Sequence, residues 1–340
     1  MSMPRILFVT TQYRVGERIY PIIPKLSELY SLDLVKLYQM DPSYEWPGDN
    51  DLRNNFDNKY LKYFDNVYKY ENINTVQIRH FSEPNNTNID YSNYNLIITD
   101  DNRTFNGLGD IYRQRKCLQL ACSHGVSEHG YEIHNVGKSY DGCFVFGQKE
   151  VKHDHQIPAG IPANDMLSNY LNVEKKHILV IINYLGHEGQ ISTGNGTVFK
   201  LFDKDVFDGI DLLSLQAQIG YPVVIKMKSR VGVDIQKDKE YLNSILPNEL
   251  NYSIIYDVED DNKLIAESIR VFSAPSTLAL KPIQLGIPTT LIPGTGQTGI
   301  FYDYEEMITN ENFIEDTLEG GKDFNSTQCF LNYIERCINE

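Results

Sequence analysis

The sequence predicts an α/β fold of two domains, each with a parallel β-sheet, that face a cleft. The length of 340 residues exceeds a typical single core and suits two domains of about 150 residues each. Short apolar runs alternate with segments of helical period, which is typical of βαβ units. Small polar residues stand where predicted strands pass into helices. We expect an N-terminal domain over 1–170, a second domain over 171–315 and a helical tail over 316–340.

The first half reads as strands separated by helices and polar loops. A buried strand over 4–10 leads through a polar turn to an amphipathic helix that ends near Tyr30. The segment 149–172 loses its periodicity and is interpreted as the interdomain connection. The other elements expected here are a strand over 32–38, a tyrosine-striped helix over 58–70 and strands over 94–100, 117–125 and 140–147.

The second half restarts with a strand from His177 and a glycine-rich loop over 184–197. This loop is neither a GxxxxGK[ST] phosphate loop nor a GxGxxG turn directly after the strand. The stretch 254–304 then reads as strand, helix, short strand, turn, helix, strand and glycine-rich loop. The remaining expected elements are a helix over 208–220, a strand over 221–230 and one or two helices from Glu311.

Composition limits the class of protein. The formal net charge of −15 disfavours general binding to nucleic acid, which depends on lysines and arginines displacing counterions. No run of about 18 apolar residues is present, and the N-terminus enters a strand directly, so we expect neither a membrane span nor a secretory signal. The five cysteines lack CxxC spacing, which favours reduced thiols in a cytoplasmic protein and no zinc site.

Candidate chemistry follows two predicted strands. His124 and Glu128 come after the strand over 117–125, and ligands of doubly wound sheets collect at the carboxyl ends of strands. A histidine with a pKa near neutrality suits a general base, and Glu128 is the second candidate. Lys226, Lys228 and Arg230 end another strand, where they could contact phosphate.

A helix that begins after Ser276 and Thr277 would offer unpaired N–H groups and a positive dipole end to an anion. A loop of small residues after the last strand could close over the same ligand. Its candidate residues are Gly294, Gly296, Gln297 and Thr298.

Two further patterns allow a metal site but have simpler explanations. His153 and His155 have a spacing that permits chelation, yet no third or fourth ligand follows nearby, so we interpret them as linker residues. The acidic run 257–262 resembles a metal motif of some sugar transferases. Asp260 and Asp261 directly precede a helix, however, so helix capping explains them more simply.

Four short segments follow one another along the chain: His124-Gly125, GIPANDML at 160–167, IKMKSR at 225–230 and SAPSTLALKPIQLGIP at 273–288. Their order resembles that in CDP-glycerol glycerophosphotransferase-like enzymes of the glycosyltransferase-B fold, which has two Rossmann-like domains. These enzymes carry a strand-end His-Gly, a Gly-x-Pro-x-x-Asp-x-Leu turn, a Lys-Leu-His-Pro segment and a Ser-Ser followed by Gly-Lys-Pro. The likeness covers roughly residues 117–290.

Two departures bear on the substrate that the resemblance implies. Lys228-Ser229 stands where the relatives have His-Pro, and Lys281 stands where they carry an acidic residue that holds the donor ribose. Both departures disfavour polyol-phosphate transfer. The resemblance then implies an altered donor pocket that includes Lys281.

The leading hypothesis is a metal-independent transferase that needs no cofactor. It would move a glycosyl group from a UDP- or CDP-linked donor, held by the second domain, to an acceptor hydroxyl held by the first. The acceptor could be a glycan, a polyol or a modified nucleobase. The alternatives are a CDP-glycerol-type transferase, an isomerase resembling the UDP-N-acetylglucosamine 2-epimerases, which Lys281 disfavours, and a non-catalytic or nucleic-acid-directed protein.

Overall fold

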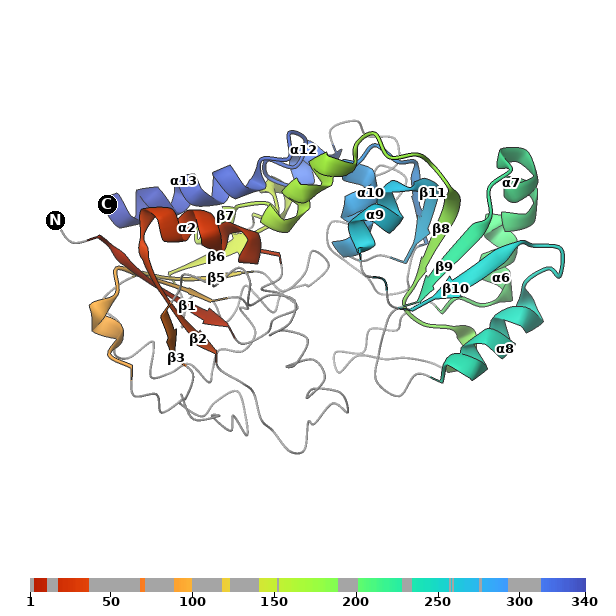
Figure 1. The fold of residues 1–340 in the computed structure, drawn as a ribbon, viewed down its shortest axis with the longest axis horizontal. Helices are drawn as coiled ribbons and strands as arrows, with labels where there is room; N and C mark the ends of the chain where they lie inside the picture. The colour runs from red at the N-terminus through yellow and green to blue at the C-terminus, as the bar shows by residue number, and fades with distance from the viewer. Residues whose placement is uncertain are drawn as a thin grey trace. The chain divides into compact units, whose positions relative to one another are not determined.

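The computed structural model describes residues 3–10, 18–36, 68–70, 89–99, 118–122, 141–151, 153–188, 201–227, 234–256, 258, 260–274, 277–292 and 313–340. The chain divides into two compact units. Unit 1 comprises Met1–Asp165 and Glu315–Glu340, and unit 2 comprises Met166–Ile314. The described residues form one β-sheet in each unit (Figure 1).

Unit 1 contains a parallel sheet with the order β3-β2-β1-β4-β5-β6-β7. The order reverses at β1, so the sheet is doubly wound, as predicted. β1 is central, and its Ile6 pairs with Leu32 on one side and Leu96 on the other. The strands are β1 (Arg5–Thr10), β2 (Ser31–Lys36), β3 (Tyr68–Tyr70), β4 (Leu96–Thr99), β5 (Leu118–Cys122), β6 (Gly142–Val145) and β7 (Gln156–Pro158).

Two segments of unit 1 differ from the sequence prediction. Residues 68–70 form β3 beside β2 and do not end a helix, because pairing with Asp33–Val35 overrides the local pattern. The segment predicted as a connection, 149–172, contains β7, which pairs with β6, and the 3-10 helix η7 (Pro162–Tyr170). Three paired residues are too short for a periodicity that could be recognised in the sequence.

The C-terminal segment completes the core of unit 1, whereas the sequence analysis set residues 316–340 apart as a tail. It contains α12 (Phe313–Thr317) and α13 (Ser326–Asn339). Phe330 of α13 is buried, and its ring centroid lies 4.1 Å from that of Phe144 in β6. α13 packs in the same cluster as α2 (Ile23–Leu29), beside which it lies in Figure 1.

The GIPANDML segment forms hydrogen bonds with the start of α13. Asp165 accepts hydrogen bonds from the backbone N–H groups of Ser326 (2.9 Å) and Thr327 (2.7 Å), the first residues of α13. Asn325, the N-cap residue of α13, makes no such side-chain bond. Gly160 has a φ of +73°, and a Cβ there would overlap the Glu319 carbonyl and Ser326. The segment that carried part of the family resemblance therefore has a structural role here.

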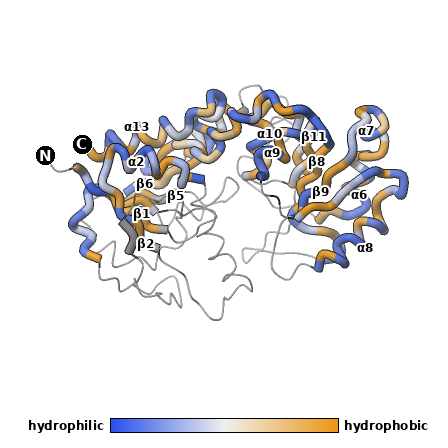
Figure 2. The backbone as a smooth tube through the Cα atoms, in the orientation of Figure 1, coloured by the Kyte–Doolittle hydropathy of each residue, from blue (hydrophilic) through white to orange (hydrophobic). Residues whose placement is uncertain are grey.

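Unit 2 contains a second parallel, doubly wound sheet with the order β10-β9-β8-β11-β12. Every residue of β8 is buried, as expected for a strand covered on both faces. Figure 2 shows β8 and β9 as hydrophobic stretches. The strands are β8 (His177–Ile182), β9 (Val223–Met227), β10 (Tyr252–Ile255), β11 (Ser268–Ser273) and β12 (Thr289–Leu291).

Helices cover both faces of this sheet (Figure 1). α6 (Lys204–Ile210), α7 (Leu212–Ile219) and α8 (Ile235–Ile245) pack on one face. α9 (Asp261–Ala266) and α10 (Leu280–Gln284) pack on the other. Two short 3-10 helices, η8 (Gly186–Glu188) and η9 (Thr277–Ala279), follow β8 and β11.

Two helical features of unit 2 depart from the prediction. The helix expected over 208–220 is two helices, because Asp211 adopts a left-handed conformation (φ 47°) and caps α7 by accepting a bond from Ser214 N–H. α8 was not predicted, since five charged or amide side chains fill its first six positions and weaken its apolar stripe. Its Asp238 and Leu242 are nevertheless buried.

The described part of the chain bears on the expectations about membrane spans and cysteines. No helix there is long and apolar enough to cross a membrane. Among the described cysteines, Cys122, Cys143, Cys329 and Cys337 are free thiols.

Candidate functional site

The sheet of unit 2 defines where a ligand would be expected. The strand order reverses at β8, so the chain leaves β8 and β11 in opposite directions. Open α/β sheets bind their ligands outside the carboxyl ends of the strands at such a reversal. The segments that follow these two strands are η8 and η9. The polar side chains near this edge of the sheet are therefore the candidate site.

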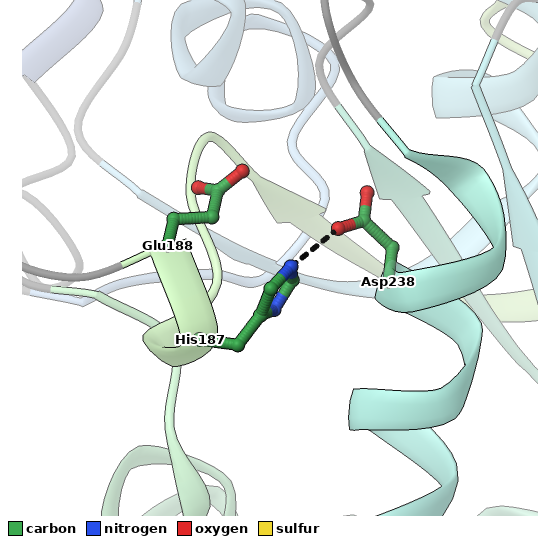
Figure 3. Close-up of side chains that lie close together, drawn as sticks. All are labelled: His187, Glu188 and Asp238. Carbon is green, nitrogen blue, oxygen red and sulfur yellow. Dashed lines mark ion pairs between the residues drawn. The ribbon is translucent and has the colours of Figure 1, made fainter.

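A histidine–carboxylate cluster lies at the end of β8 (Figure 3). His187 of η8 points its Nε2 atom toward Asp238 of α8, and Nε2 and Oδ1 are 3.1 Å apart. The Asp238 side chain is only 2% exposed, whereas that of His187 is 25% exposed. Tyr256, just beyond β10, donates a hydrogen bond from its hydroxyl to Asp238 Oδ2 over 2.9 Å. Each oxygen of the buried Asp238 carboxylate thus has a polar partner.

Glu188 completes the cluster. One ligand atom of each of His187, Glu188 and Asp238 lies within 4.8 Å of the other two. The backbone N–H of Leu185 donates to Glu188 Oε2 over 3.0 Å, which holds this oxygen near η8. The arrangement can hold a proton between imidazole and carboxylate, or bind a cation with nitrogen and oxygen ligands.

Close packing holds η8 against α8. A Cβ atom on Gly186 would overlap the hydroxyl of Tyr241 and approach Asp203 Cβ to 3.1 Å. The Tyr241 ring in turn lies 4.9 Å from the His187 ring, centroid to centroid. Burial, followed by the charge of Asp203, raises the pKa of Tyr241, so its hydroxyl stays protonated. Glycine at position 186 therefore permits the contact that brings His187 to Asp238.

A buried cation lies at the carboxyl end of β9. Lys226 is 9% exposed, and side chains alternate along β9, so it faces the side of the sheet that α9 and α10 cover. Its Nζ atom lies 3.3 Å from Asp261 Oδ1 in the first turn of α9. Within the part of the chain that the structure describes, Asp261 Oδ1 has no hydrogen-bond partner, so this ion pair is poorly aligned. The ammonium group keeps donors for a further anion.

The neighbouring residues of α9 engage the second predicted lysine. Lys281 of α10 donates a hydrogen bond from Nζ to Asn262 Oδ1 over 2.7 Å. Asp260 is the N-cap of α9, as predicted, and accepts from Lys263 N–H over 3.0 Å. It also accepts from the Tyr170 hydroxyl over 2.6 Å.

The ionisation of Asp260 follows from these contacts. Burial raises its pKa, but the hydrogen bonds from Tyr170 and from backbone N–H groups, together with the charge of Lys281, outweigh burial. The pKa of Asp260 is therefore held below its ordinary value. The hydrogen bond to Asp260, followed by burial, raises the pKa of Tyr170. Asp260 thus stays an ionised capping residue near Lys281.

The structure describes three of the predicted site residues. It joins Lys226 and Lys281 to adjacent residues of α9, and it places Thr277 at the first position of η9 beyond β11. Among the contacts between described residues, none links Lys226, Lys281 and Thr277 directly to one another. The remaining candidates lie outside the described residues: His124, Glu128, Lys228, Arg230, Ser276, Gly294, Gly296, Gln297 and Thr298.

The His187 cluster was not predicted from the sequence. His187 and Glu188 lay in a loop that was notable for glycines, and Asp238 lay in a helix that was not predicted. One usable signal was present, because GlyHisGlu follows a strand at the expected switch point of the second sheet.

Known structures resemble the chain over nearly its full length. The Staphylococcus aureus MnaA–UDP co-structure has a TM-score of 0.57 and 14% identity, covering 99% of this chain and 97% of that one. UDP-GlcNAc 2-epimerase from Neisseria meningitidis, bound to UDP-GlcNAc, has a TM-score of 0.56 and 12% identity, covering 98% and 100%. The wall teichoic acid polymerase TagF has a TM-score of 0.51 and 14% identity, covering 98% and 89%.

These likenesses establish the fold. With two doubly wound parallel sheets in its two units, the chain has the glycosyltransferase-B fold that the sequence analysis predicted. No protein-family model and no curated protein sequence matches the chain.

Proposed function

We propose that the protein binds a nucleoside-diphosphate sugar at the carboxyl edge of the unit 2 sheet and transfers its glycosyl group to an acceptor hydroxyl. The fold supports this proposal, as do the ligands named for two similar structures, UDP and UDP-GlcNAc. TagF, a polymerase of similar fold, supports group transfer in particular.

Lys226 is the observation that carries the proposal. Burying an ammonium group is costly unless it is paired and hydrogen-bonded. Lys226 is buried beside a single misaligned carboxylate within the described residues, at the edge of the sheet where ligands bind. A diphosphate at this position would supply the missing acceptors. As the sugar is transferred, negative charge develops on the leaving diphosphate, and a fixed cation stabilises it without reorganisation.

The other parts of the machinery remain predictions from the sequence. Lys228 and Arg230 continue the chain beyond β9 and would add charge beside Lys226. Ser276 with Thr277, and the loop that contains Gly294, would contribute backbone N–H groups. In unit 1, His124 is the proposed general base toward the acceptor hydroxyl, with Glu128 as the second candidate.

The test compares two lysine variants in nucleotide binding. UDP, CDP and GDP are added to the full chain, and the thermal shift yields a Kd for each nucleotide. We expect Lys226→Met to weaken the best ligand about tenfold or more, because a charged hydrogen bond to the diphosphate is lost. Lys204→Met is the matched control, since exposed Lys204 pairs with Asp208 on its own helix. Equal affinity in both variants, or no shift with any nucleotide, would contradict the proposal.

A second candidate function is epimerisation at C2 of the sugar. It is favoured by the likeness to UDP-GlcNAc 2-epimerases. An epimerase exchanges the C2 hydrogen with solvent without an acceptor, whereas a glycosyltransferase leaves it in place. Incubating the protein with UDP-GlcNAc in D₂O and following the C2 proton by NMR separates the two. We expect no exchange, and deuterium incorporation would replace the transferase proposal with the epimerase one.

A further inference from the structure

We infer that His187, Glu188 and Asp238 form a binding site for a divalent transition-metal ion at the carboxyl edge of the unit 2 sheet (Figure 3). The inference departs from the metal-independent chemistry that the sequence analysis expected. It stands on unit 2 alone and does not depend on the proposed transfer reaction.

The spacing of the donor atoms suits a metal. Two ligands of a tetrahedral site with bonds of about 2.1 Å lie about 3.4 Å apart. His187 Nε2 and Asp238 Oδ1 are already 3.1 Å apart, and the Glu188 ligand atom is within 4.8 Å of both. Glu188 is only partly buried. With Oε2 held by the Leu185 N–H, a small side-chain adjustment can bring the other carboxylate oxygen of Glu188 toward His187 and Asp238.

Outer hydrogen bonds orient two of the three ligands. Tyr256 donates to the Asp238 oxygen that faces away from His187, and the Leu185 backbone N–H donates to Glu188. Bonds of this kind fix ligating carboxylates in known metal sites and contribute to metal affinity. Buried Asp238 is thereby presented in one orientation, with Oδ1 directed at the position that a metal would share with His187.

Charge and ligand type indicate the class of ion. With a neutral imidazole, the three side chains carry the two negative charges of their carboxylates. A divalent cation would balance these two charges. Imidazole nitrogen favours Zn²⁺ and its neighbours, whereas sites made of oxygen alone favour Mg²⁺ or Ca²⁺. Three protein ligands leave a position open for water or a substrate oxygen. We therefore assign the site to Zn²⁺ or a similar first-row metal ion.

The experiment measures metal binding to the full chain without nucleotide. Chelator-treated protein is titrated with Zn²⁺ by calorimetry and with Co²⁺ by visible absorption, which separates nitrogen and oxygen ligands from thiolates. We expect one equivalent bound through nitrogen and oxygen. His187→Ala and Glu188→Gln should each weaken binding at least tenfold, and Tyr256→Phe about 10- to 100-fold, as for other outer-shell changes. His187 and Glu188 are less buried than Asp238, so these variants spare the core.

His153→Ala is the control, because exposed His153 stacks on His155 in unit 1, with their ring centroids 5.5 Å apart. Its metal affinity should equal that of the wild type. Unchanged affinity in His187→Ala, a thiolate absorption band with Co²⁺, or no binding at all would overturn the inference. The cluster would then be an ion pair between His187 and Asp238 only.

Discussion

His177 shows how burial alone gives a histidine a structural role. It begins β8, at the end of the sheet opposite the candidate site, and is 5% exposed. Its Nε2 atom lies 3.1 Å from the Leu264 carbonyl oxygen. Burial lowers the pKa of His177, and the bond to Leu264 only partly opposes this effect. The folded protein therefore keeps this imidazole neutral.

A pH dependence of stability follows from that pKa. The unfolded chain binds a proton at His177 near pH 6.5, whereas the folded chain resists it. The stabilisation is therefore present above pH 6.5 and is lost as the pH falls from 6.5 toward the lower folded pKa. In urea unfolding followed by circular dichroism, His177→Gln should flatten the decline in the free energy of unfolding between pH 7.5 and 5. The same slope in both proteins would contradict this explanation.

Single residues also show where sequence reasoning succeeds. Asp260 could be predicted as a cap, because capping depends on a local pattern of a carboxylate before a helix. The pairing of His187 with Asp238 could not be predicted, since the two residues are far apart in sequence and meet only through packing of η8 on α8. Lys226 was recognised from its strand-end position, but its burial and incomplete pairing are properties of the tertiary structure.

The element that controls the candidate site is η8, a single turn of three residues. It makes too few hydrogen bonds of its own to set the position of His187, so contact with α8 must do so. Gly186 allows this contact because it has no Cβ that would overlap the Tyr241 hydroxyl of α8. The turn, and not the strand before it, thus determines whether His187 reaches Asp238.

Two glycine variants test this dependence. Gly186→Ala forces apart η8 and the Tyr241 side chain of α8, so we expect a loss of about 1–3 kcal/mol in unfolding free energy. The His187 ring NMR signals should shift at the same time. Gly209→Ala in α6 is the control, because its Cβ would meet no atom within 4 Å, and helix propensity predicts stabilisation of about 1 kcal/mol or less. Equal stability of the two variants would mean that η8 adapts freely.

At the scale of the molecule, the chain leaves unit 1 after Asp165 and returns to it at Glu315. Phe330, Leu331 and Ile334 of α13 are buried in the same cluster as the first strands. The alternation of strands and helices predicted the fold class and most of the elements in each sheet. The return of the C-terminal helix was not predictable, because an amphipathic pattern shows that a helix buries one face but not which domain covers it.

Removing the main anchor of α13 should destabilise unit 1. Phe330 is 1% exposed against Phe144, and Phe→Ala at buried positions costs about 3–5 kcal/mol. We expect Phe330→Ala to expose unit 1 to limited proteolysis at a lower urea concentration than in the wild type. Asn332→Ala, at an exposed position of the same helix, should change stability by about 0.5 kcal/mol or less. If Phe330→Ala resisted proteolysis as well as the wild type, the stability of unit 1 would not depend on the packing of α13.

Unit 1 is made of two chain segments separated by unit 2, and this arrangement affects which unit can fold first during synthesis. Unit 2 is one continuous segment, and the ribosome has made all of it once Ile314 is added. The strands of unit 1 precede unit 2 in the sequence, but their covering helix α13 follows unit 2. Unit 2 can therefore complete its fold before unit 1 does, although domains usually fold in order from the N-terminus. During synthesis, the strands β1 to β7 therefore remain without one of their covering helices until α13 has been made.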